Sequence, residues 1–145
     1  MKLNRFEASF ARIFGNQIGI TVAGEAFFMR FYEIFLESPR VRMMFAKTDM
    51  ARQVTMLRHS MYELVTFYVT GTLTESLRHV AHLHQRLAIS SDLYDRWLDA
   101  LIATVAEFDP EYDELIEDAW RLALIPGITY MKIWCGSSRN PCDGP

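Results

Sequence analysis

The sequence has few cysteines, no cluster of basic residues and no long apolar run, and each shortage excludes a class of protein. Its two cysteines, Cys135 and Cys142, match neither a zinc-binding pattern nor a redox CxxC motif, so we interpret them as ordinary thiols, with a disulfide as the alternative. The 15 basic and 18 acidic residues form no block of one sign, which argues against a nucleic-acid or anionic membrane partner. No apolar run approaches the roughly 20 residues that span a bilayer.

The N-terminal segment also lacks the features of a secretion signal. Its first residues, MKLNRFEASF, are too polar for one, so we expect a cytoplasmic protein without a membrane partner. Apolar side chains, in contrast, are abundant, because 50% of the 145 residues are hydrophobic and 13% are aromatic. A chain of this length and composition is expected to form a single domain with a substantial core.

Apolar residues recur at helical spacing along nearly the whole chain, and no stretch alternates as a half-buried strand does. Capping residues and prolines divide this pattern into helices. Asn4 with Glu7 resembles a capping box that opens the first helix, which we expect to end near Gly15 to Gln17. Further helices are expected over 22–37, from Ser38–Pro39, from Thr48 or Asp49 to about 68, from Thr72 with Glu75, from Ser90 or Ser91 to 108, and from Asp109–Pro110 toward 134. The sequence therefore predicts an all-α fold.

The last predicted helix contains a proline, and the chain after it is polar. Pro126 followed by Gly127 interrupts the apolar pattern, and a proline removes one backbone hydrogen bond and crowds the preceding turn, so we expect a kink there. The final residues, GSSRNPCDGP, are rich in Gly, Ser and Pro and predict a disordered tail. The expected organisation is one domain over 1–135 and a tail over 136–145.

One histidine differs from the other three because it falls within an apolar stripe. On a helix, His84 lies on one face with a set of apolar residues, while His79 and His82 fall on the opposite, solvated side. The apolar residues expected within roughly 60° of His84 on that helix are Leu77, Val80, Ala81, Leu87 and Ala88. A neutral imidazole in an apolar interior needs a partner for its ring nitrogen, which is either a backbone carbonyl or a metal ion.

The long helix that starts near Met50 carries a second isolated polar group. Gln53 lies near the start of an otherwise apolar stripe. Its amide either reaches solvent at the edge of the core or has a function. The aromatic residues Phe31, Phe35 and Phe45, taken alone, indicate core packing.

Three segments together resemble the globin family, most closely the single-domain bacterial globins related to the haem domain of flavohaemoglobins. The segment FYEIFLESPRVRMMF resembles the globin B helix, the C-helix proline and the phenylalanine that stacks on haem. The segment TDMARQVTMLRHSM resembles the start of the E helix, and HQRLAISSDLY resembles the bacterial proximal motif. The resemblance runs from about residue 5 to 134. It implies the globin fold, with helices packed around a b-type haem (iron protoporphyrin IX).

The resemblance also implies roles for individual residues. His84 would be the one protein ligand of the iron, and Tyr94 would pack on the same side of the haem. Gln53 would occupy the distal position, where its amide can donate a hydrogen bond to O2. The residues that the resemblance and the helical spacing place around the haem are Phe31, Phe45, Gln53, Val54, Leu57, His84, Ile89, Tyr94 and Leu98.

The sequence departs from the flavohaemoglobin pattern in two places. Those domains commonly have a tyrosine at the distal position of the B helix. Counting eight residues back from Pro39 gives Phe31 at this position, and Tyr32, one position later, would point in a different direction. A B helix shifted by one residue would instead direct Tyr32 to the iron. Those domains also carry a glutamate late in the sequence that strengthens the hydrogen bonding of the proximal histidine. Here no acidic residue lies between Asp118 and Asp143. Peroxidase-like chemistry is therefore not expected.

The function that the resemblance implies is reversible binding of O2, and also of CO and NO, at an open sixth position of the iron. One alternative is an enzyme, either a nitric oxide dioxygenase or a nitrite reductase. Electrons would then come from a separate reductase, because the sequence shows no flavin or nicotinamide domain. A second alternative is a gas sensor or a haem-free interaction module. Both a monomer and a homodimer are consistent with the sequence.

Overall fold

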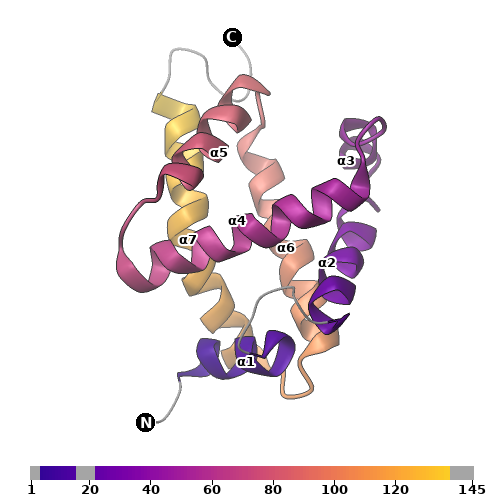
Figure 1. Cartoon of the computed structure of the whole chain (residues 1–145), viewed down its shortest axis with the longest axis vertical. Coiled ribbons are helices and arrows are strands. Elements are labelled where there is room, and N and C mark those ends of the chain that lie inside the picture. The colour runs from indigo at the N-terminus through magenta and orange to yellow at the C-terminus, as the bar shows by residue number, and fades with distance from the viewer. Residues whose placement is uncertain (1–3, 16–21, 138–145) are drawn as a thin grey trace.

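The computed structural model describes residues 4–15 and 22–137, and within these residues it contains seven α-helices and no strand (Figure 1). The helices are α1 (Arg5–Phe14), α2 (Val22–Phe35), α3 (Pro39–Met44), α4 (Met50–Thr70), α5 (Glu75–Arg86), α6 (Ser91–Phe108) and α7 (Glu114–Ser137). The predicted all-α fold is confirmed. In the part of the chain described, none of these helices is long and apolar enough to cross a membrane.

Most of the helices begin where capping residues predicted. The Asn4 side chain accepts a hydrogen bond from the backbone N–H of Glu7 at 2.8 Å, and Ser38 precedes the proline that opens α3. Asp49, one of two residues considered, caps α4 by accepting from the N–H groups of Ala51 and Arg52. Each of these caps satisfies backbone donors that the first turn of a helix leaves unpaired.

Two predicted helix starts are wrong. The cap of α5 is Thr74, whose side chain accepts from the N–H of Leu77, and not Thr72. The last helix begins at Glu114 and not at Asp109, because the Asp109 carboxylate is engaged by another helix and the chain turns until Asp113 accepts from the N–H of Ile116.

Part of the apolar stripe predicted around His84 is also wrong. Leu77 and Ala81 are buried as expected, but α5 ends at Arg86, so the two residues that follow do not continue the helical face. Leu87 and Ala88 are exposed, and Ala88 has a positive φ of 56°. His79 and His82 are exposed, as predicted.

The helices pack in crossed pairs around one core (Figure 1). Helix α2 lies along α6, α4 crosses α7, and α5 packs against one end of α7. Helix α1 closes the opposite end by packing on α7 and α2. The largest fully buried side chains of the core are Trp120, Phe14, Phe27, Phe28, Phe31 and Met61.

The crossing of α4 over α7 is close because α7 has a glycine at the contact. A Cβ added to Gly127 would lie 2.2 Å from the Leu64 Cδ2 atom of α4. Helix α7 continues through Pro126, one residue earlier. The kink expected at that proline stays a prediction.

A buried carboxylate joins α1 to the turn between α6 and α7. The Nε and Nη2 atoms of Arg12 donate to Asp109 at 2.7 Å and 2.9 Å, and the Ser9 hydroxyl donates to it as well. Trp120 in turn donates its indole N–H to the Ser9 oxygen at 2.8 Å. This network fixes the end of the molecule that lies opposite α5. The expectations about Gln17, Cys142 and the tail over 138–145 lie outside the described residues.

Candidate functional site

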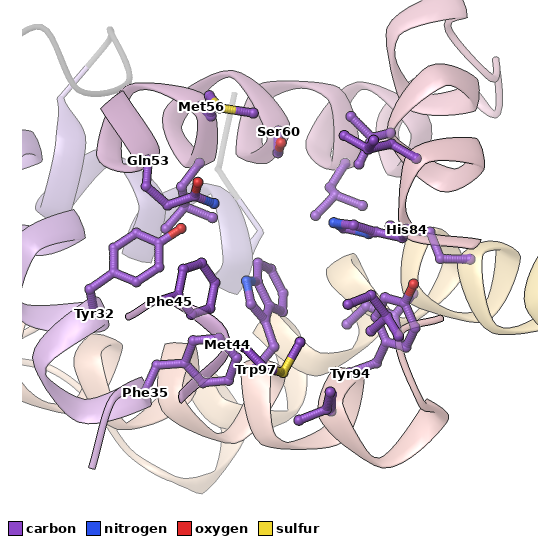
Figure 2. Close-up of a pocket in the computed structure, with 18 of the residues that line it drawn as sticks. Tyr32, Phe35, Met44, Phe45, Gln53, Met56, Ser60, His84, Tyr94 and Trp97 are labelled. Atoms are coloured by element: carbon purple, nitrogen blue, oxygen red, sulfur yellow. The ribbon is translucent and has the colours of Figure 1, made fainter. Parts of the chain in front are cut away.

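An apolar cavity lies among α4, α5, α6 and α7, and α2 and α3 close one end of it (Figure 2). It holds about 1020 Å³ of empty space, counting the part open to solvent at its mouth. The lining residues are Tyr32, Phe35, Met44, Phe45, Gln53, Met56, Leu57, Ser60, Leu64, Leu77, Val80, Leu83, His84, Ile89, Leu93, Tyr94, Trp97, Ile128 and Met131.

His84 projects into this cavity from the last turn of α5 (Figure 2). Its Nδ1 atom is buried and has no hydrogen-bond partner among the described residues. Burial lowers the pKa of His84, so the neutral imidazole is favoured and a nitrogen lone pair is available to a ligand. The ring of Tyr94 lies edge-on beside it, with the two ring centres 6.0 Å apart.

The opposite end of the cavity carries two polar side chains, Tyr32 from α2 and Gln53 from α4 (Figure 2). The Tyr32 hydroxyl and the Gln53 amide lie next to each other (Figure 2). Burial raises the pKa of Tyr32 to about 12, although the hydrogen bond to Gln53 lowers it in part. The hydroxyl is therefore protonated at neutral pH and can donate a hydrogen bond.

The structure brings six of the nine predicted haem-contacting residues to the wall of this one cavity. They are Phe45, Gln53, Leu57, His84, Ile89 and Tyr94. These residues come from three helices and two connecting segments, so the fold and not the local sequence brings them together.

Phe31 does not line the cavity, and Tyr32 does. The ring of Phe31 is fully buried on the α6 side of α2, where its centre lies 5.8 Å from that of Trp97. Neighbouring residues on a helix point about 100° apart, so Tyr32 projects toward the cavity while Phe31 faces α6. Of the two residues considered, it is Tyr32 that lines the cavity, as a B helix shifted by one residue would place it. Which of the two faces the iron stays a prediction.

Val54 and Leu98 also lie outside the cavity wall, each one residue beyond a residue that lines it. Val54 instead faces a second, more open cavity between α2 and α4, of which Tyr32 forms part of the wall. Leu98 is buried in the core one position after Trp97. The expected contact of these two residues with haem stays a prediction.

Several lining residues were not predicted, among them Trp97, Ser60 and Leu64. Helical spacing could have identified each of them. Trp97 lies three positions after Tyr94 on α6, and Ser60 and Leu64 lie three and seven positions after Leu57 on α4. Met44 and Met56 form an exposed part of the wall, which composition alone does not indicate.

These residues fit the requirements of a haem. A haem needs one axial base from the protein and apolar walls for its ring, since porphyrin nitrogens supply the other iron ligands. His84 offers an imidazole whose buried Nδ1 is not consumed by a protein hydrogen bond. Two polar groups, Tyr32 and Gln53, lie across the cavity from it (Figure 2). Among the described residues, no group of three His, Cys, Asp or Glu side chains could hold a metal ion by itself.

A solved structure is similar to this chain over nearly its whole length. It is the crystal structure of a protein from Pseudomonas aeruginosa PAO1 that is described as structurally highly homologous to a human haemoglobin. The two chains are 38% identical, the match covers 90% of this chain and 95% of that one, and the TM-score is 0.77. The chain therefore belongs to the globin family. No family model matches it, and no curated protein sequence does.

Proposed function

We propose that the protein binds haem b through His84 and reversibly binds O2, and also CO and NO, on the side of the haem that faces Tyr32 and Gln53. The observation that carries this proposal is the placement of an imidazole with an unpartnered buried nitrogen opposite two hydrogen-bonding side chains in an apolar cavity. A haem held by His84 alone would supply an iron that can bind a diatomic gas.

Each part of the wall has a separate task in this proposal. The apolar residues exclude water from the bound cofactor, and Tyr94 restricts the orientation of the His84 ring. Tyr32 and Gln53 supply hydrogen-bond donors in a low-dielectric space, where a fixed dipole stabilises a partly negative ligand more than it would in water. O2 carries such partial charge when bound and CO carries less, so these donors favour O2.

Absorption spectra of the purified protein, with ferric haem, with ferrous haem and with ferrous haem and CO, test this proposal. Wild-type protein should give a Soret band that shifts with CO. The His84→Ala variant should retain little haem, and added imidazole should restore part of the band. His82→Ala is the matched control, because His82 lies two positions away and is exposed. Loss of the band in His82→Ala but not in His84→Ala would refute the assignment.

A second candidate is nitric oxide dioxygenase activity, which the placement of Tyr32 in the cavity favours. Such an enzyme combines NO, O2 and one electron to form nitrate, and the electron would come from a separate reductase. The resemblance to flavohaemoglobins, which commonly have a tyrosine at this position, supports the candidate and stays a prediction. Stoichiometric conversion of NO to nitrate over many cycles with a supplied reductase would distinguish the enzyme from an O2 carrier. The cytoplasmic location also stays a prediction.

A further inference from the structure

Arg40 of α3 bridges to the start of α6, which lies far along the chain. Its Nη1 atom donates to the Asp92 carboxylate at 2.7 Å, and its Nη2 atom donates to the Ser90 hydroxyl oxygen at 2.6 Å. The Ser90 hydroxyl in turn donates to Asp92 at 2.6 Å, so the three side chains form a closed triangle. Arg40 and Asp92 are about half exposed, whereas Ser90 is buried. The hydrogen bond from Ser90 and the charge of Arg40 lower the pKa of Asp92, so its carboxylate is ionised at neutral pH.

Ser90 occupies the N-cap position of α6 but does not cap the helix with its side chain. A serine at this position usually accepts a hydrogen bond from a backbone N–H of the first turn. The Ser90 side chain makes no such bond. Its hydroxyl is instead engaged by Arg40 and Asp92. The hydroxyl thus serves the contact with α3 in place of the start of its own helix.

The bridge joins two segments that form parts of the cavity wall. On the α3 side, Phe45 directly follows the helix and lines the cavity. On the other side, Ile89 lines the cavity, and its N–H donates to the carbonyl of His84 at 3.2 Å. Ser90 is the next residue in the chain. The contact made by Arg40 therefore acts on the turn that directly follows the His84 helix.

Helix α3 is the least tightly packed helix in the described part of the chain. The turn that follows it is also closed on itself, because the N–H groups of Phe45, Ala46 and Thr48 donate to carbonyls within residues 41–45. The Phe45 ring contacts two aromatic rings of α2. These contacts hold the segment on the α2 side, and Arg40 joins it to the α6 side of the cavity.

From this arrangement we infer that Arg40 is a positioning residue, which fixes the separation between Phe45 and the turn after His84 and thereby retains haem in the cavity. The inference rests on the proposed function. If the two segments moved apart, the cavity would lose wall contacts on both sides, and a bound group would leave more easily. Arginine suits this task, because its planar guanidinium directs separate N–H donors to the carboxylate and the hydroxyl at once.

Transfer of haem to an excess of apomyoglobin, followed by absorption, measures how firmly the cavity retains it. Arg40→Gln should release haem about three- to ten-fold faster than wild-type protein, as expected when a charge-assisted hydrogen bond is lost. Arg40→Lys keeps the charge but not the planar fork, so its rate should lie between these two. Arg42→Gln is the matched control and should release haem at the wild-type rate, because Arg42 is exposed on the same helix and donates to the nearby carbonyl of Leu36. Circular dichroism of each variant verifies that it is folded.

Hydrogen exchange of the full chain, measured by mass spectrometry, tests the bridge itself. Arg40→Gln and Asp92→Asn should each speed exchange over residues 39–48 and 87–93. The double variant should exchange no faster than Arg40→Gln alone, because the two groups form one contact. Unchanged exchange over 87–93 in Arg40→Gln would overturn the inference, and so would an unchanged rate of haem release.

Failure of the proposed function would give a different result. A wild-type protein that binds no haem would refute that function and, with it, the role of Arg40 in retaining haem. The exchange measurement would still show whether Arg40 joins the two segments, since it does not depend on haem.

Discussion

Tyr32 of α2 and Gln53 of α4 lie next to each other at the end of the cavity opposite His84 (Figure 2). Tyr32 is also the residue that the two cavities share, since it lines both the apolar cavity and the more open one between α2 and α4. Its hydroxyl is thus held at the side of the cavity where a gas molecule would bind, and its ring separates that space from the second cavity.

The first prediction concerns the Tyr32 hydroxyl. Tyr32→Phe removes one donor and keeps the ring, so O2 release should accelerate several-fold to some tens-fold, as expected for a loss of about 1–2 kcal/mol. Release of CO should change little. Stopped-flow measurement of both rates checks this. Phe31→Tyr is the neighbouring control, and because Phe31 faces α6, it should not slow O2 release. A slower rate in that variant alone would favour the original register.

The second prediction separates a hydrogen-bonding role of Gln53 from a steric one. Gln53→Leu has nearly the same size but no donor, and it also leaves the Tyr32 hydroxyl without its partner. O2 dissociation should therefore accelerate by an amount similar to that in Tyr32→Phe. In the double variant, the O2 dissociation rate should rise by less than the product of the two single increases, because the two groups act together. Equal changes for O2 and CO would show that Gln53 acts by filling space.

The third prediction concerns stability at acidic pH. Burial by itself raises the pKa of Asp109, but hydrogen bonds from Arg12, Ser9 and the N–H of Glu111 outweigh it, so the pKa lies below its ordinary value of 3.8. The carboxylate thus stabilises the folded state fully above that ordinary value. This stabilisation decreases as the pH falls below 3.8 and is lost once the pH passes below the pKa of the folded state.

Asp109→Asn should therefore lower the free energy of unfolding at neutral pH by about 2–3 kcal/mol. It should also make the free energy of unfolding depend less on pH in the acidic range. Urea denaturation at several pH values measures both effects. Glu111→Gln is the matched control, since Glu111 is exposed and contacts Arg12 at only 3.5 Å. That control should change stability by less than about 0.5 kcal/mol. An equal loss in both variants would mean that the network is not specific to Asp109.

The fourth prediction concerns the crossing of α4 and α7. Gly127→Ala would place a methyl group against the Leu64 side chain, so the protein should lose about 1–3 kcal/mol of stability despite the higher helix propensity of alanine. Ser76→Ala, at an exposed position on α5, should change stability little. Adding Leu64→Ala to Gly127→Ala should make the double variant more stable than the sum of the single changes predicts. Additive losses in thermal unfolding would contradict the contact.

The sequence predicted the features that depend on local periodicity and capping, namely the all-α fold and most helix starts. It did not predict features that are set by contacts between residues far apart in the chain. His84 was expected to face the interior because an isolated polar residue in an apolar stripe is visible in the sequence, and it does line the cavity. Phe31 and Tyr32 could not be separated, since α2 is buried on two sides and both sides accept an aromatic ring. The start of α7 was missed because the Asp109 carboxylate is bound by Arg12, which lies 97 residues away in the chain.

Gly127 also constrains the order in which substitutions at this crossing can accumulate. A larger residue at 127 requires the Leu64 Cδ2 methyl group to move, whereas a smaller residue at 64 removes the conflict in advance. Because Leu64 also lines the cavity, the first step would enlarge the cavity and the second would refill it from the side of α7. Substitution at 64 followed by 127 passes through a looser but folded intermediate, while the reverse order passes through an overpacked one. The shape of the cavity thus depends on the residue at 127 as well as on Leu64, which lines it.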